Sequence, residues 1–206
     1  MNVKILPATL LIMFVHSGLY AQKDTGSGSV NDTNTPLHLL QPEYGVPYGE
    51  IQTEEIKESL DRIFHFLDGA TPPRVIDQAT GKPVTDLKRI DRNSRLEEGL
   101  FRLASYEWGV TYSGMLAVSE VTGDERYANY TAERFRFLAE ADPEFRRVLH
   151  DDGVIDPRMQ QMLAPRALDD AGSVCAAMIR FERGNPAFSL RPLIDRYMHY
   201  ILYQEY

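Results

Sequence analysis

Two clusters of side chains in this 206-residue sequence have types that could carry chemistry. Tyr106, Glu107 and Trp108 gather two aromatic rings and a carboxylate, and Asp169 and Asp170 stand side by side further along. Aromatic rings can stack on sugars, and a carboxyl group in a partly desolvated site can hold a proton near neutral pH. The same residues also fit a structural interpretation, in which the first cluster is a hydrophobic staple and an aspartate caps a helix.

The first cluster stands at the entrance of a predicted αα-hairpin over residues 105–138. Apolar residues recur at helical spacing on both sides of a joint at residues 122–125, TGDE. The glycine suits the left-handed conformation at a helix end, and the acids suit the positive N-terminus of the next helix. The predicted core positions are Val110, Met115, Val118 and Val121 before the joint, and Tyr127, Tyr130, Arg134, Phe135 and Leu138 after it.

The aspartate pair stands at the entrance of a second predicted hairpin, with helices over residues 171–183 and 190–203 and a turn at residues 184–186. The return helices of both hairpins carry similar segments, ERF at residues 133–135 and DRY at residues 195–197. This similarity indicates an internal repeat of roughly sixty residues. Equivalent helix ends meet around one mouth in a barrel of hairpins, so we expect the two clusters to converge.

The remaining segments are predicted from local signals. A helix from Thr53 to Gly69 is expected to bury Ile56, Leu60, Ile63, Phe64 and Leu67. The long connection over residues 71–98 is expected to hold a small hairpin between residues 75–78 and 83–85. Asp142-Pro143 predicts the start of a new helix, because proline fits a first helical turn.

The N-terminus has the pattern of an export signal. Residues 1–21 contain an early lysine, an apolar run and a small residue at Ala21, which predicts a signal peptide cleaved after Ala21 and a periplasmic or extracellular location. Residues 22–36 are polar and small, as in a flexible leader, and residues 37–206 are predicted to form the domain.

Composition excludes several classes of partner. The net charge of −8 and the scattered arginines argue against nucleic-acid binding, and no segment after the signal reaches membrane length. Cys175, the only cysteine, lies among apolar residues and is expected to be buried. The acids after His150 have a turn-like spacing, so neither a metal nor a cofactor is predicted.

Three segments together resemble the N-terminal part of glycoside hydrolase families 88 and 105, the unsaturated glucuronyl and rhamnogalacturonyl hydrolases. They are YEWGVTYSGML, TGDERY and LDDAGSVCAAMI, and the resemblance covers residues 50–206. It implies an all-α fold, an (α/α)6 barrel of which about half is present, with three of its six hairpins. It also implies hydrolysis of oligosaccharides that end in a Δ4,5-unsaturated uronic acid, by hydration of the double bond.

The resemblance also implies roles for single residues. Asp169 matches the first essential aspartate of the family, with Asp170 as the alternative if the register slips by one. Tyr106 matches a substrate-contacting tyrosine, and Trp108 would line the same mouth. The proton-donor aspartate of the family lies in a Trp-x-Asp segment that this sequence lacks, since Trp108 is its only tryptophan. The sequence therefore resembles an N-terminal fragment that is inactive alone.

Two other functions remain open at this point. One is a non-catalytic helical-hairpin protein that binds a glycan or a protein, and the other is a different α/α-barrel carbohydrate enzyme, such as an epimerase. The last hairpin is expected to expose Tyr197, Tyr200 and Ile201, which would favour self-association.

Overall fold

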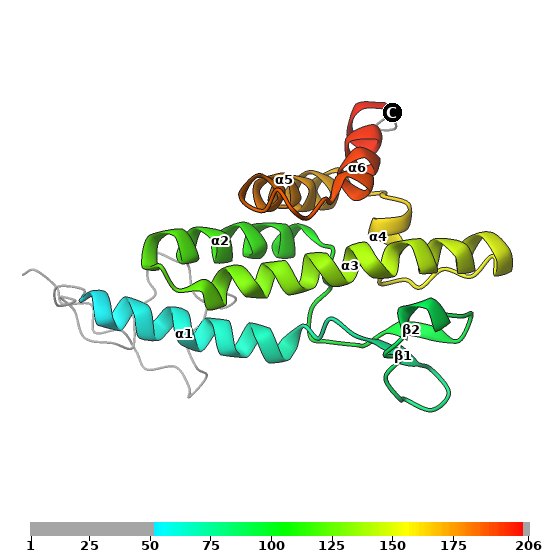
Figure 1. The fold of residues 1–206 in the computed structure, drawn as a ribbon, viewed down its shortest axis with the longest axis horizontal. Coiled ribbons are helices and arrows are strands. Elements are labelled where there is room, and N and C mark those ends of the chain that lie inside the picture. Colours follow the sequence, from blue (N-terminus) through cyan, green and yellow to red (C-terminus); the bar gives the residue numbers. More distant parts are fainter. Residues whose placement is uncertain (1–51, 204–206) are drawn as a thin grey trace, which may run out of the picture. The chain divides into compact units, whose positions relative to one another are not determined.

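The computed structural model describes residues 52–203 of the chain (Figure 1). The predicted signal peptide, leader and first residues of the domain, up to residue 51, lie outside the described residues. The described part is mostly helical, which confirms the all-α prediction. Its elements are α1 (Thr53–Ala70), β1 (Val75–Asp77), the short 3-10 helix η2 (Leu87–Arg89), β2 (Ser94–Leu96), α2 (Tyr106–Thr122), α3 (Glu125–Asp152), α4 (Gln160–Leu163), α5 (Leu168–Gly184) and α6 (Arg191–Tyr203).

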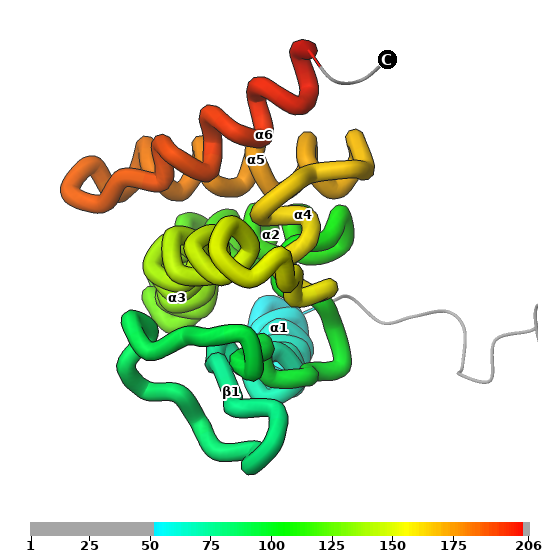
Figure 2. Tube along the Cα trace, turned by 90° about the vertical axis from the view of Figure 1, so that its right-hand side faces the viewer, coloured from blue at the N-terminus to red at the C-terminus, as the bar shows by residue number. Residues whose placement is uncertain are grey.

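Both predicted αα-hairpins are present, as α2 with α3 and as α5 with α6. Figures 1 and 2 show α1 and α5 on opposite sides of the α2–α3 hairpin, while α6 crosses α5. All five predicted core residues of α3 are buried, because its apolar stripe faces its neighbours. The first helix of each hairpin, α2 in one and α5 in the other, packs against the first helix of the other hairpin.

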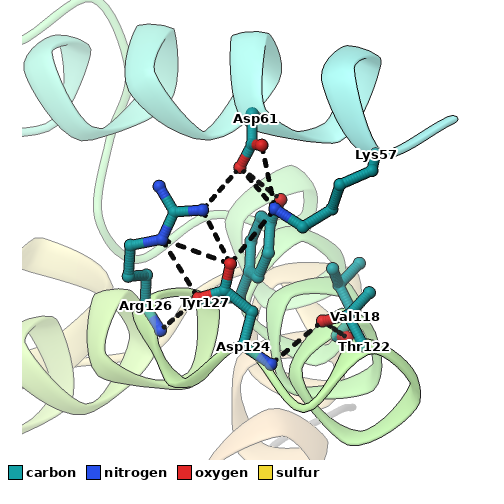
Figure 3. A network of polar contacts seen from close by, with 7 residues as sticks. All are labelled: Lys57, Asp61, Val118, Thr122, Asp124, Arg126 and Tyr127. Atoms are coloured by element: carbon teal, nitrogen blue, oxygen red, sulfur yellow. Dashed lines mark hydrogen bonds and ion pairs between the residues drawn. The ribbon is translucent and has the colours of Figure 1, made fainter. Parts of the chain in front are cut away.

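The joint between α2 and α3 reverses the chain, caps α3 and contacts α1. Gly123 adopts the left-handed conformation with φ 72°, and the Asp124 carboxylate accepts a hydrogen bond from the Arg126 amide at 3.1 Å to cap α3. Figure 3 shows that this joint also docks onto α1. Asp61 accepts hydrogen bonds from Arg126 and from the Tyr127 hydroxyl, both at 2.9 Å, and Lys57 lies 3.1 Å from Asp124.

The predicted faces of α1 and α2 need correction. In α1, Ile56 and Ile63 are exposed, and only the stripe of Leu60, Phe64 and Leu67 packs against the core. In α2, Val110 and Val121 are exposed. The buried positions of α2 are Trp108, Gly109, Tyr112, Met115 and Leu116. Apolar and small residues surround α2 almost completely, so the pattern alone did not select the face that α3 and α5 cover.

One predicted boundary was wrong, and one predicted hairpin gains a further strand. Helix α3 runs through Pro143 without a break, because Asp142 and Phe145 are buried on either side of it while Pro143 itself is exposed. The predicted hairpin between residues 75–78 and 83–85 is present as a bridge between Ile76 and Pro83, with hydrogen bonds on either side from the Asp77 amide to the Lys82 carbonyl at 2.9 Å and from the Val84 amide to the Val75 carbonyl at 2.8 Å. Strand β1 also pairs with β2 in antiparallel register, which the sequence did not predict.

The last helix is better covered than predicted. Tyr197 is buried, and its hydroxyl lies 3.1 Å from the sulfur of Met162. Leu202 and Tyr203 are the large apolar residues that α6 exposes. The expectation that Tyr197, Tyr200 and Ile201 are exposed was therefore wrong for Tyr197, while the other two are half-buried against the core. Self-association through this end stays a prediction.

Helices α2 and α5 run in the same direction and approach very closely at Gly109. A Cβ atom at this position would overlap the Ser173 side chain and backbone and lie 2.6 Å from the Val174 amide nitrogen. Further along, Arg180 on α5 donates hydrogen bonds to the carbonyl of Ser113 and to Glu120. The glycine after the aromatic cluster is thus required by the contact between the two helices.

We expect Gly109→Ala to destabilise the fold by about 1–3 kcal/mol, because the added methyl group meets backbone atoms that cannot move independently. Gly114→Ala is the matched control on the same helix, since a Cβ there meets nothing within 4 Å. This control is expected to be neutral or to stabilise by up to about 1 kcal/mol. Urea unfolding compares the two. Equal effects of both substitutions would contradict the close contact.

The ion pairs of Lys57, Asp61, Asp124 and Arg126 at the α2–α3 joint make the free energy of unfolding depend on pH. The pKa of Asp61 lies below its ordinary value of 3.8, chiefly because Lys57 and then Tyr127 hydrogen-bond to its carboxylate. A lowered pKa stabilises the fold above the unfolded-state pKa, and this term is lost as pH falls through the folded-state pKa. We expect Asp61→Asn to be less stable than the wild type near pH 7, with the gap closing below about pH 4.

Urea midpoints measured at both pH values test this dependence. Glu58→Gln is the control, because Glu58 lies on the same helix and makes no ion pair within the described part of the chain. A gap for Asp61→Asn that stays constant down to pH 2–3 would contradict the assignment.

Candidate active site at the entrances of α2 and α5

The entrances of α2 and α5 meet, and one carboxylate joins them. The backbone amide of Tyr106 donates a hydrogen bond to Asp170 Oδ1 at 2.7 Å, and the Ser173 hydroxyl donates one to the Tyr106 carbonyl at 2.8 Å. The first amides of a helix have no partner within the helix. Asp170 therefore caps α2 from the neighbouring hairpin, and the two clusters lie side by side as expected.

Asp170 is buried and both of its oxygens are occupied. Besides the Tyr106 amide on Oδ1, Gln161 Nε2 donates to Oδ2 at 2.7 Å. The side-chain oxygen Oε1 of Gln161 in turn accepts a hydrogen bond from the Arg166 amide at 2.8 Å, which fixes the loop before α5. Protein donors occupy both oxygens of this buried carboxylate. Asp170 therefore has a structural role, in which it holds the start of α2 to Gln161.

Asp169 is exposed beside this clamp. One of its oxygens accepts a hydrogen bond from the Asp170 amide at 2.9 Å, and its carboxylate has no side-chain partner among residues 52–203. Of the two aspartates, Asp169 is thus the one available to a bound molecule. The two neighbours therefore differ in burial and in the number of partners.

Tyr106 and Glu107 complete the polar side of the entrance. The Tyr106 side chain is 49% exposed. Glu107 is exposed, and its pKa lies below its ordinary value because the Ser105 hydroxyl hydrogen-bonds to it, with smaller help from its own amide and from Arg102. The two helix entrances therefore expose the Tyr106 phenol and the carboxylates of Glu107 and Asp169.

Trp108 lies beneath this surface. It is only 4% exposed, and its indole nitrogen donates a hydrogen bond to the Tyr130 hydroxyl at 3.0 Å. The ring of Phe101 stacks on it with centroids 4.5 Å apart and is itself 41% exposed. Phe101 is the aromatic surface that the sequence analysis missed, because it sits in a loop without periodicity.

A buried arginine holds α1 against this layer. Arg134 is fully buried, with its guanidinium 3.6 Å from the centroid of the Tyr130 ring. It donates hydrogen bonds to the carbonyl and the carboxylate of Asp68 and to the Thr71 hydroxyl at the end of α1. Thr71 in turn lies 3.0 Å from the Tyr130 hydroxyl, so α1, α2 and α3 share one network.

The equivalent arginine of the second hairpin does similar work. Arg196 binds both oxygens of Asp142 on α3, at 2.6 and 3.0 Å, and donates to the Met162 carbonyl at the end of α4. Each of these arginines, from the ERF and DRY segments, thus ties the end of another helix to a return helix, and the repeat itself stays a prediction.

Other chemistry finds little support in this part of the chain. Among residues 52–203 no group of three or more His, Cys, Asp and Glu side chains is arranged to hold a metal, and His150 pairs with Asp151 at 2.8 Å on the surface. Cys175 is buried as predicted, and burial raises the pKa of its thiol. No helix in the described range has the length and apolar character to cross a membrane.

We expect Asp170→Asn to destabilise the fold by about 1–3 kcal/mol, because one amide hydrogen-bond donor would then face the Tyr106 or the Gln161 donor. Asp169→Asn, one residue earlier on an exposed position, is the control and should change stability by less than about 0.5 kcal/mol. Thermal or urea unfolding measures both. A larger loss for Asp169→Asn than for Asp170→Asn would reverse the roles assigned here.

A search of curated proteins finds no match. A family model described as Glycosyl Hydrolase Family 88 matches residues 75–206, which is more than half of the chain and includes both helix entrances. The chain therefore belongs to Glycosyl Hydrolase Family 88.

Proposed function

We propose that the chain carries one wall of the active site of an exported glycoside hydrolase. Its substrate is an oligosaccharide with a Δ4,5-unsaturated uronic acid at the non-reducing end, as polysaccharide lyases produce. The observation that supports this most is the joining of the two helix entrances by Asp170, which leaves Asp169 and Tyr106 exposed at one mouth. Export rests on the signal pattern of residues 1–21.

The reaction is a hydration rather than a direct attack on the glycosidic bond. A carboxylic acid protonates the enol-ether double bond at C4, water adds at C5, and the hemiketal that results opens with release of the next sugar. In this proposal Asp169 faces the unsaturated ring and the added water, and Tyr106 contacts the sugar. Trp108 acts from below, by holding Phe101 and the α2 entrance in place.

The proton donor is not assigned to this chain. The family's second aspartate belongs to a Trp-x-Asp segment, and the only tryptophan in the sequence is Trp108, which is followed by glycine and valine. This observation favours a second candidate, a glycan-binding protein without turnover. Both candidates bind the same ligand at the same mouth, so binding and turnover must be measured separately.

We expect the chain to bind an unsaturated uronyl disaccharide in calorimetry, and Tyr106→Ala to weaken that binding by about tenfold through loss of the ring contact. Val110→Ala is the control, since Val110 lies on the same helix, is similarly exposed and is not part of the mouth. Failure to bind any of a panel of pectic and glycosaminoglycan lyase products would contradict the proposal.

Turnover is followed by the ultraviolet absorbance of the conjugated double bond. Because the proton donor has no counterpart in the sequence, we expect the 206-residue chain alone to leave this absorbance unchanged while it binds the disaccharide. A steady loss of absorbance would show that a residue within the chain donates the proton, and its abolition by Asp169→Asn would then identify the catalytic wall.

A further inference from the structure

Helices α2 and α5 lie side by side (Figure 1) and together leave one apolar face open to solvent. Residues three or four positions apart lie on the same side of a helix, and on this side of both helices the side chains are exposed or half-buried. We call this surface the α2–α5 face, and its apolar members are Val110 and Val121 on α2 and Leu168, Gly172, Ala176 and Ile179 on α5. Its valines are 52% and 86% exposed. An exposed apolar surface shared by two helices is typical of a contact site.

The α5 part of this face is complementary in shape to an antiparallel copy of itself. Gly172 lies four residues before Ala176, and Ile179 lies three residues after it. When two such helices run antiparallel with their Ala176 residues opposite each other, each Ile179 lies opposite the Gly172 of the other helix. A Cβ atom at Gly172 would meet nothing within 4 Å in the chain, so the space above this glycine is open. The small residue at the crossing point lets the two helix axes approach closely.

The charges on α5 fit the same antiparallel arrangement. Asp169 lies seven residues before Ala176, and Arg183 lies seven residues after it, which is about two helical turns on either side. Both side chains are exposed, and neither makes an ion pair with another side chain in the described part of the chain. The neighbouring Arg180, in contrast, pairs with Glu120 at 2.7 Å. An antiparallel copy therefore brings each free carboxylate to a free guanidinium, and symmetry forms this pair twice.

We propose that a second copy of this chain docks antiparallel on the α2–α5 face, about a two-fold axis at Ala176. Apolar contact supplies the attraction, and the pairing of Asp169 with the partner's Arg183 fixes the direction and the register. The docked copy covers Asp169 and Tyr106, so the dimer closes the mouth formed by the two helix entrances. This inference concerns association alone and does not rest on the proposed function. It gives the predicted self-association a surface on α5, the first helix of the last hairpin.

Sedimentation equilibrium of the 206-residue chain between about 1 and 200 µM tests the charge pairing. We expect Arg183→Asp to weaken dimerisation by at least about tenfold, because both ion pairs become contacts between like charges. Arg92→Asp is the control, since it changes the net charge equally at an exposed position outside the α2–α5 face. The double variant Asp169→Arg, Arg183→Asp reverses both charges and should recover the wild-type dimerisation constant to within about threefold.

The shape of the contact is tested separately at Gly172. Gly172→Leu fills the space that receives the partner's Ile179, and we expect it to weaken dimerisation by at least about tenfold. Gly69→Leu is the control, because a Cβ atom there also meets nothing within 4 Å and the position lies on α1, outside the α2–α5 face. Thermal unfolding at about 1 µM, where the chain is dilute, shows whether each variant keeps the fold of the single copy.

Each other outcome overturns the proposal. A wild-type chain that stays monomeric over the whole concentration range shows that another part of the chain or a different partner covers the face. A dimer that Arg183→Asp weakens no more than Arg92→Asp, or Gly172→Leu no more than Gly69→Leu, forms through another surface. Failure of the double charge reversal to restore dimerisation contradicts the antiparallel register. Association beyond the dimer contradicts the two-fold axis.

Discussion

The close parallel contact between α2 and α5 is the constraint on which the rest of the site depends. Gly109 lets the α2 backbone approach Ser173, and at that distance Asp170 can accept the first amide of α2. A bulkier residue at position 109 would separate the helices and leave the Tyr106 amide without this acceptor. Tyr106 and Asp169 therefore lie close together because the backbones of α2 and α5 approach closely there. Their neighbourhood has this structural cause whether or not either side chain is catalytic.

The other buried polar groups keep this contact in place from outside. Arg134 fixes the end of α1 beneath Trp108, and Arg196 ties α4 and α6 to α3. At the opposite end of α2, the ion pairs of Asp61 and Asp124 dock the joint of the hairpin on α1. The α2–α3 hairpin is thus held to α1 at both ends, and Arg196 ties the α5–α6 hairpin to α3. Helices that buried polar groups hold in this way suit a site where exposed side chains bind a ligand and the helices do not move.

The sequence predicted what local chemistry determines. The TGDE joint, the stripe of α3 and the helix predicted over residues 171–183, which begins at Leu168, were confirmed, because glycine conformation, capping and a one-sided apolar pattern act within a few residues. The face of α2 could not be predicted, since apolar and small residues cover it almost all round. The division between Asp169 and Asp170 could not be predicted either, because adjacent helical residues point in different directions and only the Tyr106 amide decides which is buried.

Hydrogen exchange at the Tyr106 amide tests the central contact most directly. As the first residue of α2, Tyr106 has no acceptor within its own helix, and an amide in that position ordinarily exchanges freely with water. If Asp170 joins the two entrances, this amide is protected to the same extent as the amides inside α2, and its proton resonance lies downfield as expected for a bond to a carboxylate. Exchange at the rate of an unprotected amide would contradict the account.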